Sequence, residues 1–75
     1  MKKQVIITYC KPCGYIKRAT LVANALLEKL NIKAELVAGS GGVFKVEVDG
    51  KIVAQRTREH FPDVDEIVDL VSSEI

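Results

Sequence analysis

Two apolar patterns follow one another in the first thirty residues. The run from Gln4 to Tyr9 is almost continuously apolar, which predicts a strand in the middle of a sheet. Beyond it, apolar residues recur every three or four positions, which predicts a helix from Pro12 or Cys13 to Leu30. The expected buried face of this helix consists of Ile16, Ala19, Ala23, Leu26, Leu27 and Leu30.

The ends of this helix carry their own signals. Pro12 suits the first helical position, because the N–H group that it lacks would have no partner there. Asn31 can adopt the left-handed conformation that ends a helix, with Ile32 as its apolar contact. The next strand is predicted from Lys33 to Val37, and a helix of this length between two strands indicates a right-handed unit with parallel strands.

The middle of the chain is typical of a β-hairpin. Asp49-Gly50 is a strong two-residue turn signal between predicted strands Val43–Val48 and Lys51–Arg56. Such a turn pairs Val48 with Lys51 and Val46 with Val53. The face expected to be apolar consists of Phe44, Val46, Val48 and Val53, with Ile52 on the other face.

The last helix is predicted from Asp63 to the C-terminus. Asp63 followed by Glu66 is a capping-box pattern in its Asp variant. The apolar stripe consists of Val64, Ile67, Val68, Val71 and Ile75. The order β-α-β-β-β-α predicts an α/β fold (an α+β two-layer sandwich) of thioredoxin-like type, with both helices on one face of a four-stranded mixed sheet. We expect residues 1–75 to form one such domain.

Charge and hydropathy narrow the class of function. Eleven basic and ten acidic residues give a net charge of +1, which argues against a nucleic-acid or membrane-surface binder. No segment approaches the roughly 18 apolar residues of a membrane span. The apolar run after Met1-Lys2-Lys3 is too short for a signal peptide, so we expect a cytoplasmic protein.

The candidate chemistry lies between the first strand and the first helix. Cys10 and Cys13 are the only cysteines, and two thiols at this spacing can close into a disulfide and reopen. A helix N-terminus favours a thiolate. In a reducing compartment such a pair indicates redox or metal chemistry more than a structural cross-link. We expect catalytic roles for Cys10 and Cys13, without a cofactor or metal. The expected supporting loop or partner surface is Tyr9, Lys11, Pro12, Gly14 and Tyr15.

Other residues near the pair have two interpretations each. Lys11, Lys17 and Arg18 either lower a thiol pKa or are solvated surface charges. His60 is either a proton carrier or an ordinary surface residue, and it is the only obvious third ligand for a zinc site. The loop Gly39-Ser40-Gly41-Gly42 precedes a strand, not a helix, so gating of the cysteines is a better interpretation than phosphate binding.

Two motifs together resemble a known family. Tyr9-Cys10-Lys11-Pro12-Cys13-Gly14-Tyr15, followed by the hairpin from Gly41 to Lys51, is similar to the selenoprotein W-related (Rdx) family, which includes selenoproteins T, W and H. The resemblance implies a thioredoxin-like fold and a redox role, with protein thiols or disulfides or glutathione as partners. It also implies that Cys13 occupies the selenocysteine position of selenium-bearing members.

The family and the thioredoxin analogy point to different attacking sulfurs. By analogy with thioredoxin we expect Cys10 to be more exposed and to attack, with Cys13 resolving the mixed disulfide. The selenium position favours Cys13 instead. The leading hypothesis is a thiol–disulfide redox protein that cycles Cys10 and Cys13. The alternatives are a redox-sensing protein-binding module without catalysis and a dimer that binds zinc through the Cys pair.

Overall fold

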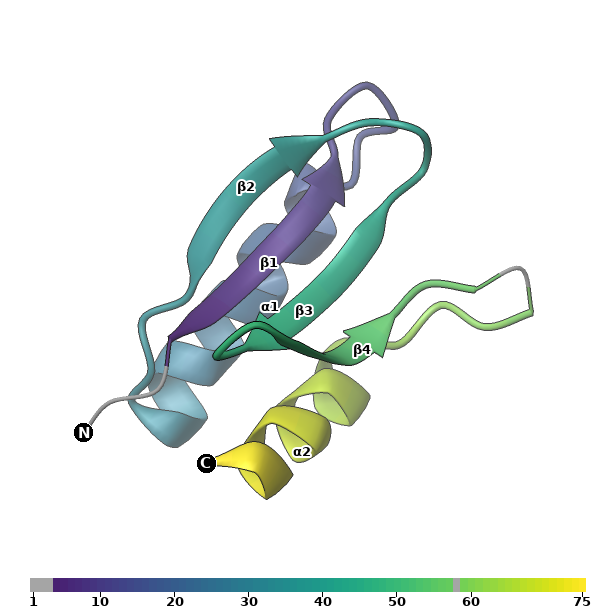
Figure 1. Ribbon diagram of the computed structural model, residues 1–75. Helices are drawn as coiled ribbons and strands as arrows, with labels where there is room; N and C mark the ends of the chain where they lie inside the picture. Colours follow the sequence, from purple (N-terminus) through teal and green to yellow (C-terminus); the bar gives the residue numbers. More distant parts are fainter. Residues whose placement is uncertain (1–3, 58) are drawn as a thin grey trace.

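The computed structural model describes residues 4–57 and 59–75, which form a sheet with helices against it. The elements are β1 (Val5–Cys10), α1 (Ile16–Leu30), β2 (Glu35–Gly39), β3 (Phe44–Val48), β4 (Lys51–Gln55) and α2 (Val64–Glu74). The strands lie in the order β2-β1-β3-β4, with β1 parallel to β2 and antiparallel to β3 (Figure 1). The predicted element order and mixed sheet are confirmed.

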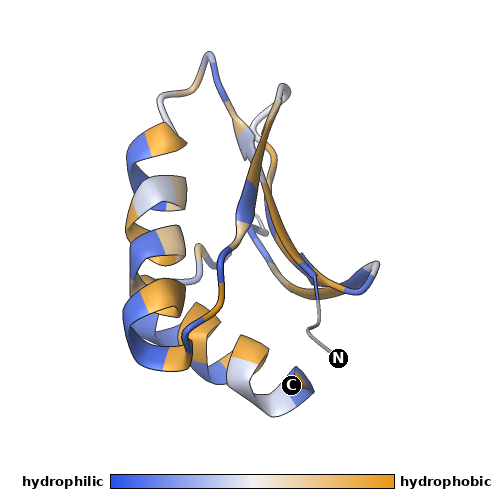
Figure 2. Ribbon diagram, turned by 90° about the vertical axis from the view of Figure 1, so that its left-hand side faces the viewer, coloured by the Kyte–Doolittle hydropathy of each residue, from blue (hydrophilic) through white to orange (hydrophobic). Residues whose placement is uncertain are grey.

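Both helices cover the same face of the sheet, as Figure 2 shows. The burial of β1 and β3 alternates along each strand, because successive side chains point to opposite faces. The core between the layers consists of Val5, Ile7, Tyr9, Phe44, Val46, Val48 and Ala54 from the sheet, and of Ala19, Val22, Leu26, Ile67, Val68 and Val71 from the helices. The loops between the strands and helices therefore meet at the ends of the strands.

The buried face of α1 differs from the predicted one. Ile16 and Leu27 are 45% and 50% exposed, whereas Val22, which was not expected in the core, is 1% exposed. Ala19, Val22 and Leu26 form one stripe at three- and four-residue spacing. The helix is therefore rotated relative to the expected face, because it packs against α2 as well as the sheet.

The hairpin between β3 and β4 has the predicted turn but a different register. Asp49 and Gly50 both have positive φ, at 52° and 84°, as a type I′ turn requires. Val48 pairs with Lys51 as expected, but Val46 pairs with Ala54, so its predicted pairing with Val53 is wrong. A bulge at Val46/Glu47 shifts the register by one residue and brings Ala54 into the core.

The ends of the helices follow their local signals, while β2 is displaced. Asn31 has a φ of 54°, and its N–H donates to the carbonyl of Leu27 at 3.1 Å. Asp63 caps α2, because its Oδ1 accepts a hydrogen bond from the N–H of Glu66 at 2.8 Å. β2 begins two residues later than the predicted Lys33. Neither α1 nor α2, the helices of the described residues, is long and apolar enough to cross a membrane.

Candidate functional site

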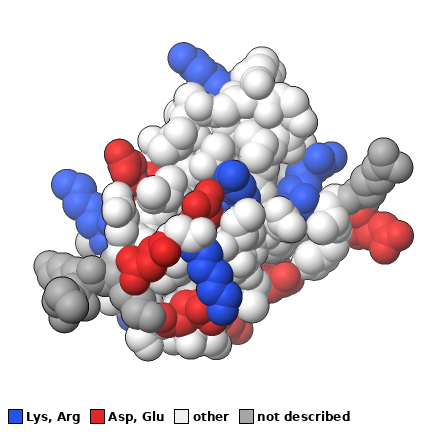
Figure 3. Space-filling view, in the orientation of Figure 1, with Lys and Arg blue, Asp and Glu red and all other residues white. Residues whose placement is uncertain are grey.

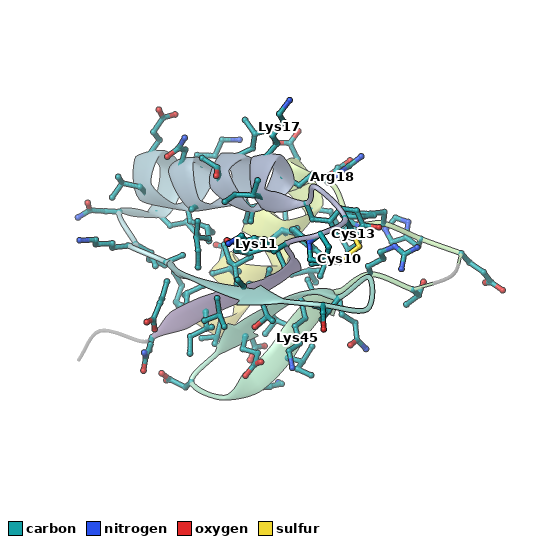
Figure 4. The ribbon with its side chains drawn as sticks, turned by 90° about the horizontal axis from the view of Figure 1, so that it is seen from above. Cys10, Lys11, Cys13, Lys17, Arg18 and Lys45 are labelled. Atoms are coloured by element: carbon teal, nitrogen blue, oxygen red, sulfur yellow. A yellow bond between two sulfur atoms is a disulfide. The ribbon has the colours of Figure 1, made fainter. Side chains whose placement is uncertain are left out.

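The two cysteines meet at the end of the central strand. Cys10 is the last residue of β1, and a disulfide joins it to Cys13 in the loop before α1 (Figure 4). Their Cα atoms lie 5.3 Å apart, which is within the usual range for a disulfide. The structure therefore brings the predicted pair together in its oxidised form.

A tight turn, not a helical turn, carries the second cysteine. The N–H of Gly14 donates to the carbonyl of Lys11 at 3.1 Å, with Pro12 at the second position of this turn. Gly14 has a φ of +79°, which a right-handed helix cannot accommodate. The predicted helix start at Pro12 or Cys13 is therefore wrong, because α1 begins only at Ile16. Cys13 therefore lies three residues before α1 and outside its first turn, and it is in this first turn that the helix dipole acts most strongly.

Backbone hydrogen bonds hold this loop against the sheet. The N–H of Lys11 donates to the carbonyl of Gly39 at 3.1 Å, and Cys10 lies beside Gly39 in the parallel register. The N–H of Tyr15 donates to the carbonyl of Cys10 at 3.3 Å. Backbone hydrogen bonds thus hold both ends of the loop that carries the two sulfurs.

The two sulfur-bearing residues differ sharply in exposure. Cys10 is 0% exposed, because it continues the central strand, whereas Cys13 lies on the exposed turn. The expectation that Cys10 is the more exposed of the two is therefore wrong. A partner from solution reaches the disulfide from the side of Cys13.

Three of the four aromatic residues gather next to the cysteine loop. The rings of Tyr15 and Phe61 meet edge to face at 5.2 Å between centroids, and those of Phe44 and Phe61 lie 5.1 Å apart. Tyr15 and Phe61 are half-buried and Phe44 is buried. Tyr9, in contrast, is 7% exposed and belongs to the core, so of the two tyrosines only Tyr15 lies in this cluster.

Two guanidinium groups lie over this aromatic cluster of Tyr15, Phe44 and Phe61. The Cζ of Arg18 is 4.2 Å from the centre of the Phe61 ring. The Cζ of Arg56 is 5.9 Å from the Tyr15 ring, and its Nη1 donates to the carbonyl of Gly42 at 3.3 Å. In the sequence, Arg56 ends a predicted strand, and no role was expected for Arg56 or Phe61. The chain has only four Phe and Tyr residues, so the position of each one in the sequence was a signal that could have drawn attention to them.

The other candidate residues lie away from the sulfurs or on the open surface. His60 does not form part of the cysteine loop: its Nε2 contacts both carboxylate oxygens of Glu66, at 2.7 and 2.9 Å. Lys11, Lys17 and Pro12 are exposed, and Lys17 and Lys45 project to opposite sides in Figure 4. Within residues 4–57 and 59–75, no group of three or more His, Cys, Asp or Glu side chains is placed to hold a metal ion.

Comparisons with known proteins identify the family of this chain. The family model described as "Rdx family" matches residues 4–73. The chain belongs to the Rdx family. A crystal structure of a selenoprotein W-related protein from Vibrio cholerae superposes on this Rdx protein with a TM-score of 0.81 at 27% identity, over 99% of this chain and 98% of the other.

Other relatives extend this picture. A crystal structure of a Bordetella parapertussis protein gives a TM-score of 0.88 at 26% identity and covers both chains completely. Migration and invasion enhancer 1 is 34% identical over 65% of this chain in Mus musculus and 31% identical over 67% in Bos taurus. The match covers 44% of each of these curated relatives, so the Rdx protein spans less than half their length. The neighbours confirm the selenoprotein W-like, thioredoxin-like fold, and the family together with the disulfide-bonded pair supports a redox role.

Proposed function

We propose that this Rdx protein is a thiol–disulfide redox protein in which Cys13 exchanges with partners and Cys10 is the second, buried sulfur of the cycle. The observation that carries the proposal is the asymmetry of the disulfide, with one sulfur on an exposed turn and the other in the central strand. A thiolate at Cys10 would have no contact with water, which disfavours charge, whereas one at Cys13 would face water.

The cycle needs only thiols. A partner thiolate attacks Sγ of Cys13, a partner–Cys13 disulfide forms, and the Cys10–Cys13 bond breaks. Cys10 leaves as a thiolate and takes a proton from water. A second thiol then attacks the partner sulfur and releases Cys13, so that two electrons have passed from the partner thiols to the protein. Oxidation of the dithiol by a partner disulfide follows the same steps in reverse.

Trapping with single variants tests which sulfur exchanges. Cys10→Ser leaves Cys13 without its resolving thiol, so we expect this variant to accumulate mixed disulfides with added disulfides or with cell proteins. Cys13→Ser leaves only the buried Cys10, and we expect it to accumulate few. Non-reducing electrophoresis and mass spectrometry of the adducts measure both. Accumulation on Cys13→Ser but not on Cys10→Ser would reverse the assignment.

A redox titration tests the cycle itself. In glutathione buffers we expect the Cys10–Cys13 dithiol of the wild-type chain to be oxidised to the disulfide in one transition, with the loss of two hydrogen atoms. The midpoint potential of this transition should lie within about −180 to −300 mV, as for redox-active protein disulfides. Intact mass and thiol alkylation follow the transition. A chain that stays fully reduced across this range has no redox cycle. We expect protein thiols or glutathione as partners and a reducing compartment such as the cytoplasm.

One observation favours a second candidate, a redox-sensing binding module. The outer face of α1 exposes Ile16 and Leu21, at 45% and 58%, and these line a shallow pocket with Lys17 and Thr20. Because Ile16 lies three residues after Cys13, oxidation can alter this surface. A partner that binds the oxidised wild-type chain, is released on reduction, is not bound by Cys10→Ser or Cys13→Ser and never forms a mixed disulfide would favour this candidate over exchange.

A further inference from the structure

Three lysines of the molecule form ion pairs, whereas two arginines near the cysteine loop form none with the residues that the structure describes. Lys29, Lys45 and Lys51 each form an ion pair with a carboxylate, at 3.2, 3.4 and 3.1 Å. Among the described residues, neither Arg18 nor Arg56 has an acidic side chain within ion-pair distance. Both guanidinium groups are instead held over Tyr15 and Phe61, beside the cysteine loop.

Acidic residues are missing from three of the segments that build this end of the molecule. The first acidic residue of the chain is Glu28, and residues 36–46 contain none. These segments supply the cysteine loop, the first turns of α1 and the loop from β2 to β3. Figure 3 shows no acidic side chain at the upper end of the drawn face, over the ends of β1 and β2. Glu59 belongs to the loop after β4, which extends away from the sheet in Figure 1.

We propose that Arg18 and Arg56 select partner proteins whose reactive cysteine is flanked by acidic residues. This inference rests on the redox function proposed above. The two guanidinium groups come from different segments: Arg18 of α1 lies 4.2 Å from the centre of the Phe61 ring, and Arg56, just after β4, lies 5.9 and 6.0 Å from the centres of the Tyr15 and Phe61 rings. We expect an extended acidic segment to contact both guanidinium groups while its thiol reacts at Cys13, and a small anionic thiol to depend less on them. Bidentate pairing with carboxylates is what a guanidinium offers better than a lysine.

The selected step is the first exchange of the cycle. The partner thiolate attacks Sγ of Cys13, the Cys10–Cys13 bond breaks, and Cys10 leaves as a thiolate that water protonates. Carboxylates on either side of the partner cysteine contact Arg18 and Arg56 as this bond forms. A second partner thiol then completes the oxidation of the partner. The guanidinium groups act on binding and orientation of the segment, so they are specificity determinants and not catalytic residues.

Peptide thiols of different charge test the proposal on the oxidised wild-type chain. The peptides are Glu-Glu-Cys-Glu-Glu, Gln-Gln-Cys-Gln-Gln and Lys-Lys-Cys-Lys-Lys, and the rate of protein reduction is followed by acid quench and intact mass. Each rate is divided by the same peptide's rate with a small uncharged disulfide, which removes differences in thiolate fraction. We expect the acidic peptide to be about tenfold faster than the neutral one at low salt, and its advantage to shrink in high salt.

Variants assign the preference to the two guanidinium groups. Arg18→Gln and Arg56→Gln should each lower the acidic-to-neutral ratio about two- to fivefold. Arg56→Lys should keep part of the preference, because it retains the charge. Lys33→Gln, an equal loss of charge at the other end of α1, should leave the ratio unchanged. Mercaptosuccinate, a small anionic thiol, should depend less on the two arginines than the acidic peptide does.

The outcomes separate this inference from the function on which it rests. Reduction of the protein by all three peptides with the same normalised rate overturns the selection by Arg18 and Arg56, but not the redox function. An equal dependence of mercaptosuccinate and the acidic peptide on the arginines overturns the protein segment as the occupant. Failure of every peptide to reduce the Cys10–Cys13 disulfide contradicts the proposed function itself.

Discussion

The N-termini of the two helices follow opposite rules. α2 begins with the cap of Asp63 and has Asp65 and Glu66 in its first turn, which suits the positive pole of a helix. α1 has Tyr15 at its N-cap position, without a side-chain cap, and has no acidic residue in its first turn, which contains Lys17 and Arg18 instead. Favourable interactions between acidic side chains and a helix N-terminus are thus found at α2 and not at α1, the helix that follows the cysteine loop.

This difference shows which helix start serves stability and which serves the site. Basic residues at a helix N-terminus are unfavourable to folding, typically by about 0.3–1 kcal/mol each. Local rules of this kind are most often broken where a protein has a function. The start of α1 adjoins the cysteine loop and has Arg18 over the Phe61 ring, whereas the start of α2 carries the cap that stabilises its helix.

The largest difference is expected between an isoleucine near the start of each helix. Ile67 of α2 is 0% exposed, whereas Ile16 of α1 is 45% exposed. Ile67→Ala should lower the free energy of unfolding by about 2–5 kcal/mol, because it leaves a cavity in the core. Ile16→Ala should change it by no more than about 0.5 kcal/mol. Urea unfolding followed by circular dichroism measures both, and equal losses would contradict the division between the helices.

The parts of the fold that sequence predicted are those with strong local signals. The continuous apolar run gave β1, Asp49-Gly50 gave the hairpin turn, and Asp63 gave the start of α2. Each of these features depends on a few neighbouring residues, such as a turn that needs two positive φ angles or a side chain that caps a free N–H. The order of these elements predicted the thioredoxin-like mixed sheet, and the family motifs implied the same fold.

The parts that sequence did not predict depend on contacts between distant segments. The bulge at Val46/Glu47 places Ala54, and not Val53, opposite Val46, and no residue in this segment of the sequence indicates it. The late start of α1 follows from the conformation of Gly14, whereas Pro12 by itself favours an earlier start. The burial of Cys10 follows from the place of β1 in the centre of the sheet. The cysteine pair was therefore located by sequence, but the sulfur that faces solvent was not.

Glycines at the two ends of the sheet give the next test. Gly14 in the cysteine turn and Gly50 in the hairpin turn have φ values of +79° and +84°, and no heavy atom lies within 4 Å of a Cβ added at either. Alanine at each should therefore cost about 1–2 kcal/mol through backbone strain alone.

Only the change in the cysteine turn should reach the chemistry. Gly14→Ala should shift the midpoint of the Cys10–Cys13 couple, whereas Gly50→Ala should leave it unchanged. Gly14→Asn, which tolerates the left-handed region, should restore most of both properties. Chemical unfolding and a glutathione titration of the same samples provide the two readouts. A shifted midpoint in Gly50→Ala would show that general destabilisation, not the turn, controls the couple.

Removal of the α2 cap is expected to have an intermediate effect. Asp63→Ala leaves the N–H of Glu66 without its 2.8 Å partner, so it should lower the free energy of unfolding by about 0.5–2 kcal/mol. Asp69→Ala removes the same charge from the exposed middle of α2 and should be neutral or slightly stabilising, because alanine favours helix. Exchange rates with thiol peptides should not change in either variant. Slower exchange in Asp63→Ala would mean that the two helix starts are coupled.

The smallest effect is the sharpest test, because stability and selectivity should move in opposite directions. Lys17→Glu puts an acidic residue in the first turn of α1, which should raise the free energy of unfolding by about 0.3–1 kcal/mol. The same change brings a negative charge next to Arg18 and should slow reduction by the acidic peptide relative to the neutral one. Lys29→Glu is the mirror control: it places an acid at the negative end of α1 and faces Asp65, so it should lower stability and leave selectivity unchanged. If Lys17→Glu gains stability but keeps its preference for acidic thiols, the basic residues at the start of α1 do not contribute to partner selection.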